Sequence, residues 1–261
     1  MALMSGQRYV SHELTHFVGR GLREQYATPE QVQEQQFVLL VRIMRQGELG
    51  RLFTSPGYVI ALAAKGAARL SSNTKYSGQM VCFCDIPVED LNLHMRKYSQ
   101  FGLAFSKQFL IDKGATPVFY VSQDSVIQNS WVVSSVPEET RTTMPLREVF
   151  DSYEKDWERL LSDVHSHRSD PTRAALKNQL VVLRLKLERL LHSQLKFFDS
   201  AKDEQDEGNF YMEREWRVMG TVAFRIEDVT RVILPQSFAK RFRQELPDYY
   251  AQVTFSQEPT S

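Results

Sequence analysis

Residues 80–86 read MVCFCDI, a run of mostly apolar residues that ends at Pro87. Short apolar runs bounded by turn-forming residues are typical of buried β-strands. Two similar runs follow, FGLAF at residues 101–105 and PVFYV at residues 117–121. Three strands this close together in the chain predict the nucleus of a sheet.

Further elements are predicted on both sides of this nucleus. Thr28 followed by Pro29 is a typical helix start, and Gly47 is a natural stop. Between them, apolar residues fall on one helical face: Phe37, Leu40, Val41 and Met44. Late in the chain, the runs at residues 215–222, 229–234 and 251–255 predict strands, and residues 237–245 predict a helix.

The region between these two groups of strands is helical in pattern. A helix is predicted over residues 145–165, and Asp170 before Pro171 starts a second one. We therefore predict an α+β protein, with a single mixed sheet domain and an inserted long helical hairpin.

The predicted domain boundaries follow from this pattern. Residues 1–122 and 209–261 form the sheet domain, and residues 123–208 form the inserted hairpin with an acidic loop.

Five leucines on the second helix of the hairpin alternate spacings of four and three, as in a short heptad seam. They are Leu176, Leu180, Leu183, Leu187 and Leu190. Because sustained coiled coils usually need three or four heptads, we favour packing of this seam against the neighbouring helix. The alternative is a homodimer interface.

The composition limits the possible partners and location. Lys+Arg and Asp+Glu are both 32, so the formal charge is zero, which does not indicate binding to nucleic acid or to an anionic membrane. No signal peptide or membrane-spanning stretch is evident.

The two cysteines, Cys82 and Cys84, are expected to lie on opposite faces of a strand. They are therefore not expected to form a disulfide with each other. We expect a cytoplasmic protein.

The most suggestive chemistry lies in EREWR, residues 213–217. Glu213 and Glu215 are two residues apart at a strand entrance, so both point to the same face. Such a pair can hold a substrate hydroxyl and stabilise developing positive charge. The alternative is a strand end with ordinary cross-strand Arg–Glu pairs, in which Arg214 and Arg217 take part.

A second group of candidates lies near the N-terminus. His16 and Arg20 stand beside the glycines of a turn, and this arrangement can receive a phosphate or a ribose. No acidic third ligand accompanies His12 and His16, so we expect no metal. Tyr98 can stack on a ligand ring or belong to the core.

Five ordered blocks resemble the AbiGi family of phage abortive-infection proteins. They are SHELTHFVGR (11–20), CFCDIP (82–87), KYSQFGLAFSK (97–107), PVFYV (117–121) and EREWR (213–217). The resemblance implies a bacterial cytoplasmic defence protein that acts with a second protein. It also implies the antitoxin side of a toxin–antitoxin pair.

The same layout is similar to that of ADP-ribosyltransferases, and this second resemblance implies residue roles. The catalytic residues are Glu215, Glu213 and His16, and NAD is the possible cofactor. Arg20, Tyr98 and Arg217 are the implied cofactor-binding residues. The chain departs from the pattern because it has no His-Gly pair and no Ser-Thr-Ser strand motif.

Two functions are therefore carried forward. The first is an antiphage protein with an NAD-binding or nucleotide-binding pocket of the ADP-ribosyltransferase type. The second is a non-catalytic antitoxin or regulator that binds a partner toxin. A metal-dependent nuclease using Asp85, Glu213 and Glu215 ranks last.

Overall fold

The computed structural model describes residues 11–50, 71, 73, 80–128, 143–165 and 171–256. These residues form two compact units. The first unit holds residues 11–50, 80–117 and 212–256, and the second holds residues 71, 73 and 118–211 within the described ranges. Each unit is described here by itself.

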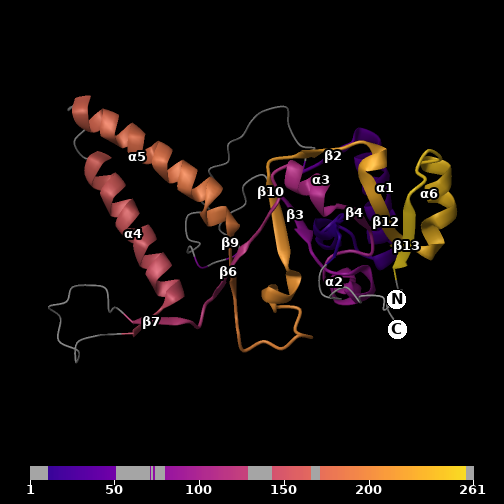
Figure 1. The fold of residues 1–261 in the computed structure, drawn as a ribbon, viewed down its shortest axis with the longest axis horizontal. Coiled ribbons are helices and arrows are strands. Elements are labelled where there is room, and N and C mark those ends of the chain that lie inside the picture. Colours follow the sequence, from indigo (N-terminus) through magenta and orange to yellow (C-terminus); the bar gives the residue numbers. More distant parts are fainter. Residues whose placement is uncertain are drawn as a thin grey trace, which may run out of the picture. The chain divides into compact units, whose positions relative to one another are not determined.

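A seven-stranded mixed sheet forms the centre of the first unit (Figure 1). Its order is β13-β12-β4-β1-β3-β10-β5. The bounds are Glu13–Phe17 for β1, Met80–Cys84 for β3, Gly102–Ser106 for β4, Thr116–Pro117 for β5, Glu215–Met219 for β10, Val229–Pro235 for β12 and Gln252–Ser256 for β13. Only β12 and β13 pair in parallel, and the other pairs are antiparallel. The α+β prediction is confirmed.

One face of this sheet carries the main core. Helix α1 (Pro29–Gln46) packs Phe37 and Leu40 there, and α6 (Ala239–Glu245) adds Phe242. The predicted signals of α1 are confirmed, because the Thr28 side chain accepts a hydrogen bond from the Gln31 N–H. Gly47 ends the helix at a φ of 65°, a left-handed conformation that glycine adopts without strain.

The opposite face carries a smaller cluster under the short helix α2 (Asn92–Lys97). Cys84, Ile86, Leu91, Met95 and Ile233 form this cluster. The 3-10 helix η2 (Val88–Asp90) precedes α2 in the chain. Another 3-10 helix, η1 (Arg20–Glu24), contacts α2 through hydrogen bonds of Arg23. The chain enters β10 from a third, η5 (Phe210–Glu213).

Short elements complete the first unit. Helix α3 (Lys107–Asp112) follows β4, and β2 (Glu48–Leu49) pairs with β11 (Val222–Ala223). The 3-10 helices η6 (Ile226–Asp228) and η7 (Gln236–Phe238) flank β12.

The second unit contains the inserted hairpin, which is confirmed. Helix α4 (Leu146–His165) runs beside α5 (Pro171–Leu190), and η4 (His192–Gln194) follows (Figure 1). Asp170, the predicted cap of α5, lies outside the described residues. Within the described part of the chain, no helix has the length and apolar content that a membrane crossing requires.

Two small sheets accompany the hairpin. Strand β6 (Phe119–Ser122) pairs in parallel with β9 (Leu195–Phe198), and β7 (Val126–Gln128) pairs with β8 (Thr143–Pro145). The PVFYV run was predicted to belong with residues 80–86 and 101–105 in one sheet. This prediction is wrong for most of the run, because only Pro117 pairs in the large sheet.

The expectation that the two cysteines lie on opposite faces of the strand is also wrong. Both lie on β3, two residues apart, and side chains alternate along a strand, so they share one face. Neither cysteine forms a disulfide, and Cys82 is exposed whereas Cys84 is buried.

Candidate functional site

The pairing register of β10 places Glu215 and Arg217 on the α2-covered face of the sheet. Glu215 is opposite Cys84, and Arg217 is opposite Cys82. Arg214, just before the strand, has a positive φ of 44°, and its carbonyl accepts a hydrogen bond from the Asp85 N–H. This turn brings Glu213 to the same side of the sheet as Glu215.

Glu215 and Arg217 form a buried two-point ion pair. The Arg217 Nε donates to Glu215 Oε1 at 2.7 Å, and Nη2 donates to Oε2 at 3.2 Å. Both side chains are more than nine-tenths buried. Burial disfavours the charged guanidinium, but the hydrogen bonds and charge of Glu215 outweigh it and raise the pKa of Arg217.

Glu213 is held by the end of α2. The Lys97 Nζ donates to Glu213 Oε1 at 2.7 Å, and the Tyr98 hydroxyl donates to the same oxygen. Glu213 is 5% exposed. Burial, together with the Glu213 charge, raises the pKa of Tyr98 above its usual range, so the phenol stays protonated and remains a donor.

Aromatic rings and an arginine border this pair of carboxylates. Phe17 stacks on His94 and Tyr98, with ring centroids 6.5 and 6.0 Å apart. The exposed Arg20 places its guanidinium carbon 4.9 Å from the centroid of the Tyr98 ring. Such contacts between a cation and a ring face are favourable.

The 3-10 helix η1, which carries Arg20, is linked to α2 by Arg23. Arg23 donates to the carbonyls of Met95, Arg96 and Lys97, the last carbonyls of α2. Arginine near a helix C-terminus satisfies carbonyls that have no partner within the helix. Gly19, before η1, has a φ of 80°, and a Cβ there would lie 2.8 Å from the Gln36 side chain.

The structure therefore brings together five of the six predicted site residues: Glu213, Glu215, Arg217, Arg20 and Tyr98. His16 does not join them. Its neighbour Thr15 is opposite Cys84, on the Glu215 face, so His16 points to the other face. The expected grouping of His16 with Glu215 is corrected for this reason.

His16 contacts the main-core side of the sheet. Its Nδ1 lies 2.9 Å from the Cys82 carbonyl, and its ring is 5.8 Å from that of Phe83. Burial lowers the pKa of His16, which favours the neutral ring.

Asp85 forms a separate ion-pair group at the end of β3. It accepts from Lys107 Nζ at 2.9 Å and from the Ser11 N–H at 3.2 Å, and Arg214 approaches to 3.8 Å. In the described ranges, no three or more His, Cys, Asp or Glu side chains are arranged to hold a metal ion.

The sequence patterns missed Lys97 and Phe17. Lys97 belongs to a quoted block, KYSQFGLAFSK, but its partner Glu213 is 116 residues away. No spacing rule connects residues that far apart. The stacking of Phe17 on the α2 rings depends equally on tertiary contact.

In chemical terms, this cluster is a buried group of charges with one exposed cation. Glu213 is paired with Lys97, and Glu215 is paired with Arg217. Each of these ion pairs is neutral, and Arg20 adds one positive charge to the cluster. Arg20 is exposed and lies over the Tyr98 ring at the edge of this cluster.

The geometry defines a class of protein: an α+β sheet with an inserted helical hairpin and buried ion pairs at the start of β10. The chain belongs to the family described as "Putative abortive phage resistance protein AbiGi, antitoxin", whose model matches residues 64–251. It is also similar to "Abortive phage resistance protein AbiGi" of Lactococcus lactis subsp. cremoris, with 28% identity over 144 residues. That alignment covers 53% of this chain and 49% of the relative, so the match spans about half of the relative's length. No solved structure matches the chain.

Proposed function

We propose that this chain is an abortive-infection protein that acts by binding a partner protein, as the antitoxin of a toxin–antitoxin pair. The family description supports the antitoxin role, and the name of the lactococcal relative supports a part in phage resistance. The neutral overall charge also fits a protein partner better than a nucleic acid.

The observation that carries this proposal is the exposed aliphatic surface of the hairpin. Several side chains of α4 and α5 are at least one-third exposed: Leu160, Leu176, Val181, Val182 and Leu183. Gln179, Val182, Leu183 and Lys186 also line a shallow hollow on α5. Val182 and Leu183 share this hollow, and exposed apolar side chains that lie together mark interaction sites. An amphipathic helix or groove of a partner can cover such a surface.

The test uses the full chain and the protein encoded beside its gene. Leu183→Asp, which puts a charge into the apolar surface, is expected to weaken the complex at least tenfold. Ser237→Asp adds the same charge at an exposed position of η7 in the first unit and serves as the matched control. Isothermal titration calorimetry measures both affinities. Equal affinities of the two variants contradict this role of the hairpin.

A second candidate function is favoured by Arg20, which lies exposed over the face of Tyr98 beside two carboxylates. In this proposal, a nucleotide or NAD lies against Arg20 and Tyr98, and Glu215 holds a ribose hydroxyl after release from Arg217. Such chemistry requires the Glu215–Arg217 pair to open. Opening this pair is costly because both groups are buried.

Ligand-dependent thermal stability tests the second candidate. NAD or a nucleotide that binds only the folded state raises the melting temperature in a concentration-dependent manner. Arg20→Ala removes the exposed cation and is expected to abolish this shift. Lys240→Ala, exposed on α6, is the control. No shift with NAD, ATP or GTP contradicts the proposal.

A further inference from the structure

Three aromatic rings of the second unit form a surface on the sheet of β6 and β9. Tyr120 of β6, Phe198 of β9 and Tyr211 of η5 each contact the other two rings. The centroid of Tyr211 lies 5.0 Å from that of Phe198 and 5.2 Å from that of Tyr120, and the last two are 6.2 Å apart. Tyr211 is 53% exposed. An exposed tyrosine that is held by other rings is a typical anchor at protein interfaces.

Helix α4 packs on the other face of this small sheet. Phe197 and Phe198 are consecutive on β9, so their side chains point to opposite faces. Phe197 is buried and lies 5.5 Å from Phe150 of α4 between ring centroids. Tyr120 is opposite Lys196 in the register, so it shares the face of Phe198. The aromatic surface therefore lies on the face away from Phe150.

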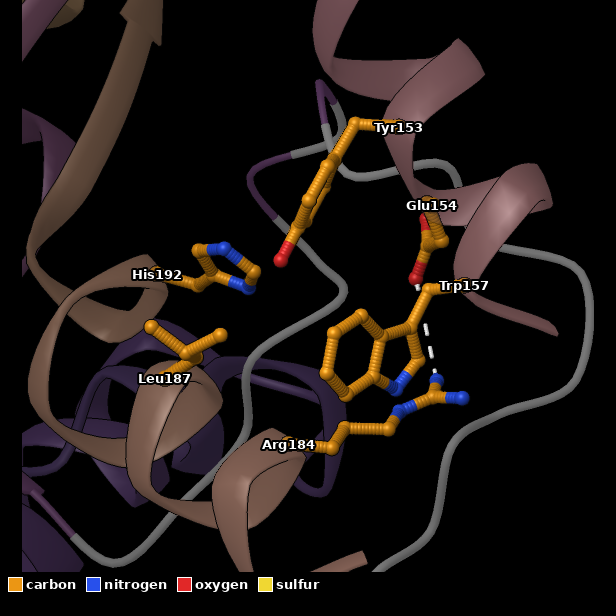
Figure 2. A pocket seen from close by; sticks show the side chains of 6 residues that line it. All are labelled: Tyr153, Glu154, Trp157, Arg184, Leu187 and His192. Atoms are coloured by element: carbon orange, nitrogen blue, oxygen red, sulfur yellow. Dashed lines mark ion pairs between the residues drawn. The ribbon is translucent and has the colours of Figure 1, made fainter. Parts of the chain in front are cut away.

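Contacts between α4 and η4 fix the start of β9. Figure 2 shows the six side chains that line a small hollow where α4, α5 and η4 meet: Tyr153, Glu154, Trp157, Arg184, Leu187 and His192. The phenol of Tyr153 on α4 points toward the buried His192 of η4, with ring centroids 6.0 Å apart. Because η4 leads directly into β9 at Leu195, these contacts also hold the strand that carries Phe198.

An acidic loop connects Phe198 to Tyr211. Residues 199–207 hold five acidic residues and one lysine, a net charge of −4. Three of the acidic side chains are exposed: Asp203, Glu204 and Glu207. Because the loop begins and ends at the aromatic surface, its negative charge lies beside the rings. Such a charge attracts cations to the surface and repels anions.

Two sets of hydrogen bonds order this loop. Asp124, just after β6, accepts from the backbone N–H and the hydroxyl of Ser200 at 3.2 and 3.1 Å. The side-chain amide of Asn209 donates to the carbonyls of Lys202 and Asp203 at 3.1 and 2.9 Å. A loop that is ordered before binding loses less conformational entropy when a partner binds.

The chain itself places a cation on a ring beside this surface. The Lys196 ammonium lies 4.6 Å from the centroid of the Phe210 ring. Lys196 is opposite Tyr120 in the register, and Phe210 precedes Tyr211 in the chain. Arginine makes such contacts more often than lysine, because its guanidinium is flat and weakly hydrated. Tyr211 offers a partner the same kind of contact.

We propose that the aromatic surface and the acidic loop bind a basic segment of the partner protein. An arginine guanidinium of that segment stacks on Tyr211, and neighbouring cations face the carboxylates of the loop. The inference rests on the proposed partner-binding function and adds the chemistry of the segment that docks. Bases of single-stranded nucleic acid also stack on exposed tyrosine rings. Their phosphates, however, would meet the excess negative charge of the loop.

The first test uses the full chain and a blocked tetra-arginine peptide at low salt. The chain has ten tyrosines, and Tyr211→Phe identifies the signals of the Tyr211 ring in a ¹H–¹³C spectrum. The tetra-arginine peptide is expected to move these signals saturably. A blocked tetraglutamine peptide and an oligothymidylate are expected to leave them in place.

Variants separate the contribution of the ring from that of the loop charge. Tyr211→Leu is expected to weaken peptide binding by about threefold to tenfold, whereas Tyr211→Phe keeps the ring and stays within about twofold of the wild type. Glu204→Gln with Glu207→Gln is expected to weaken binding by about threefold and to reduce its salt dependence. Glu24→Gln with Glu89→Gln removes the same charge at exposed positions of the first unit and serves as the control. Circular dichroism verifies the fold of each variant.

Three results overturn the inference. The first is a Tyr211 signal that ignores the tetra-arginine peptide. The second is a signal that moves with oligothymidylate, which would assign the surface to nucleic acid. The third is a partner affinity of Tyr211→Leu within about twofold of the wild type. The two proposals fail separately, because Leu183→Asp tests the hairpin surface and the peptide titration needs no partner.

Discussion

Arg217 binds Glu215 from two positions further along the same strand, through hydrogen bonds of 2.7 and 3.2 Å. Residues two apart on a strand share a face, so the fork of the guanidinium meets both carboxylate oxygens. Because both groups are buried, each one keeps the other from being an isolated charge in the interior. The pair is thus a structural unit as well as a candidate site.

Glu215→Ala is expected to lower the free energy of unfolding by about 3–5 kcal/mol, because it leaves the Arg217 charge buried without its carboxylate. Urea denaturation monitored by circular dichroism measures this loss. The double variant Glu215→Leu with Arg217→Met is the control, and it is expected to recover most of the stability. A stable Glu215→Ala protein that no longer protects cells from phage would instead assign Glu215 to ligand binding.

Tyr98→Phe is expected to lower the free energy of unfolding by about 1–3 kcal/mol, because Glu213 loses the hydrogen bond from the phenol while it stays buried. The ring contacts with Phe17 and Arg20 are kept in this variant. Thermal and urea unfolding measure the change. Tyr26→Phe, at an exposed position, is the control and is expected to change stability by less than about 0.5 kcal/mol.

The titration of His94 predicts a dependence of stability on pH. Burial lowers the pKa of His94 to about 4, whereas the residue titrates near 6.5 in an unfolded chain. Between these values the unfolded state binds a proton that the folded state does not. The free energy of unfolding therefore falls as the pH decreases from about 6.5 toward 4, by up to about 3 kcal/mol.

His94→Gln removes this contribution, so its stability is expected to change less between pH 6.5 and 5 than that of the wild type. Urea midpoints at a series of pH values measure the difference. His12→Gln, at an exposed position, is the control and keeps the wild-type slope. Equal slopes for His94→Gln and the wild type contradict the assignment.

Local sequence patterns predicted the helices and strands of this fold better than they predicted which strands pair. The cap at Thr28, the stop at Gly47 and the two hairpin helices are encoded within a few residues, so the sequence reveals them. Which strands pair depends on contacts between distant segments. This is why PVFYV was placed in the wrong sheet for most of its length.

The same limit explains the outcome for the site residues. Glu213 and Glu215 lie on one side as predicted, but Glu213 precedes the strand, and the turn at Arg214 brings it there. The position of His16 depends on the register of β1 against β3, which no local pattern contains. The pairing of Glu213 with Lys97 likewise requires the fold of α2 onto the sheet.

The leucines of α5 give a prediction that separates helix packing from dimerisation. Leu187 lines the hollow between α4 and α5, whereas Leu183 is 46% exposed. If the seam packs against α4, Leu187→Ala lowers the free energy of unfolding by about 1–2 kcal/mol, because it removes half-buried apolar area. Leu183→Ala then changes the free energy of unfolding by less than about 0.5 kcal/mol.

A homodimer through Leu176 and Leu183 predicts that Leu183→Ala is the more destabilising change and that stability rises with protein concentration. Urea unfolding at several concentrations, with light scattering for the molar mass, distinguishes these two outcomes.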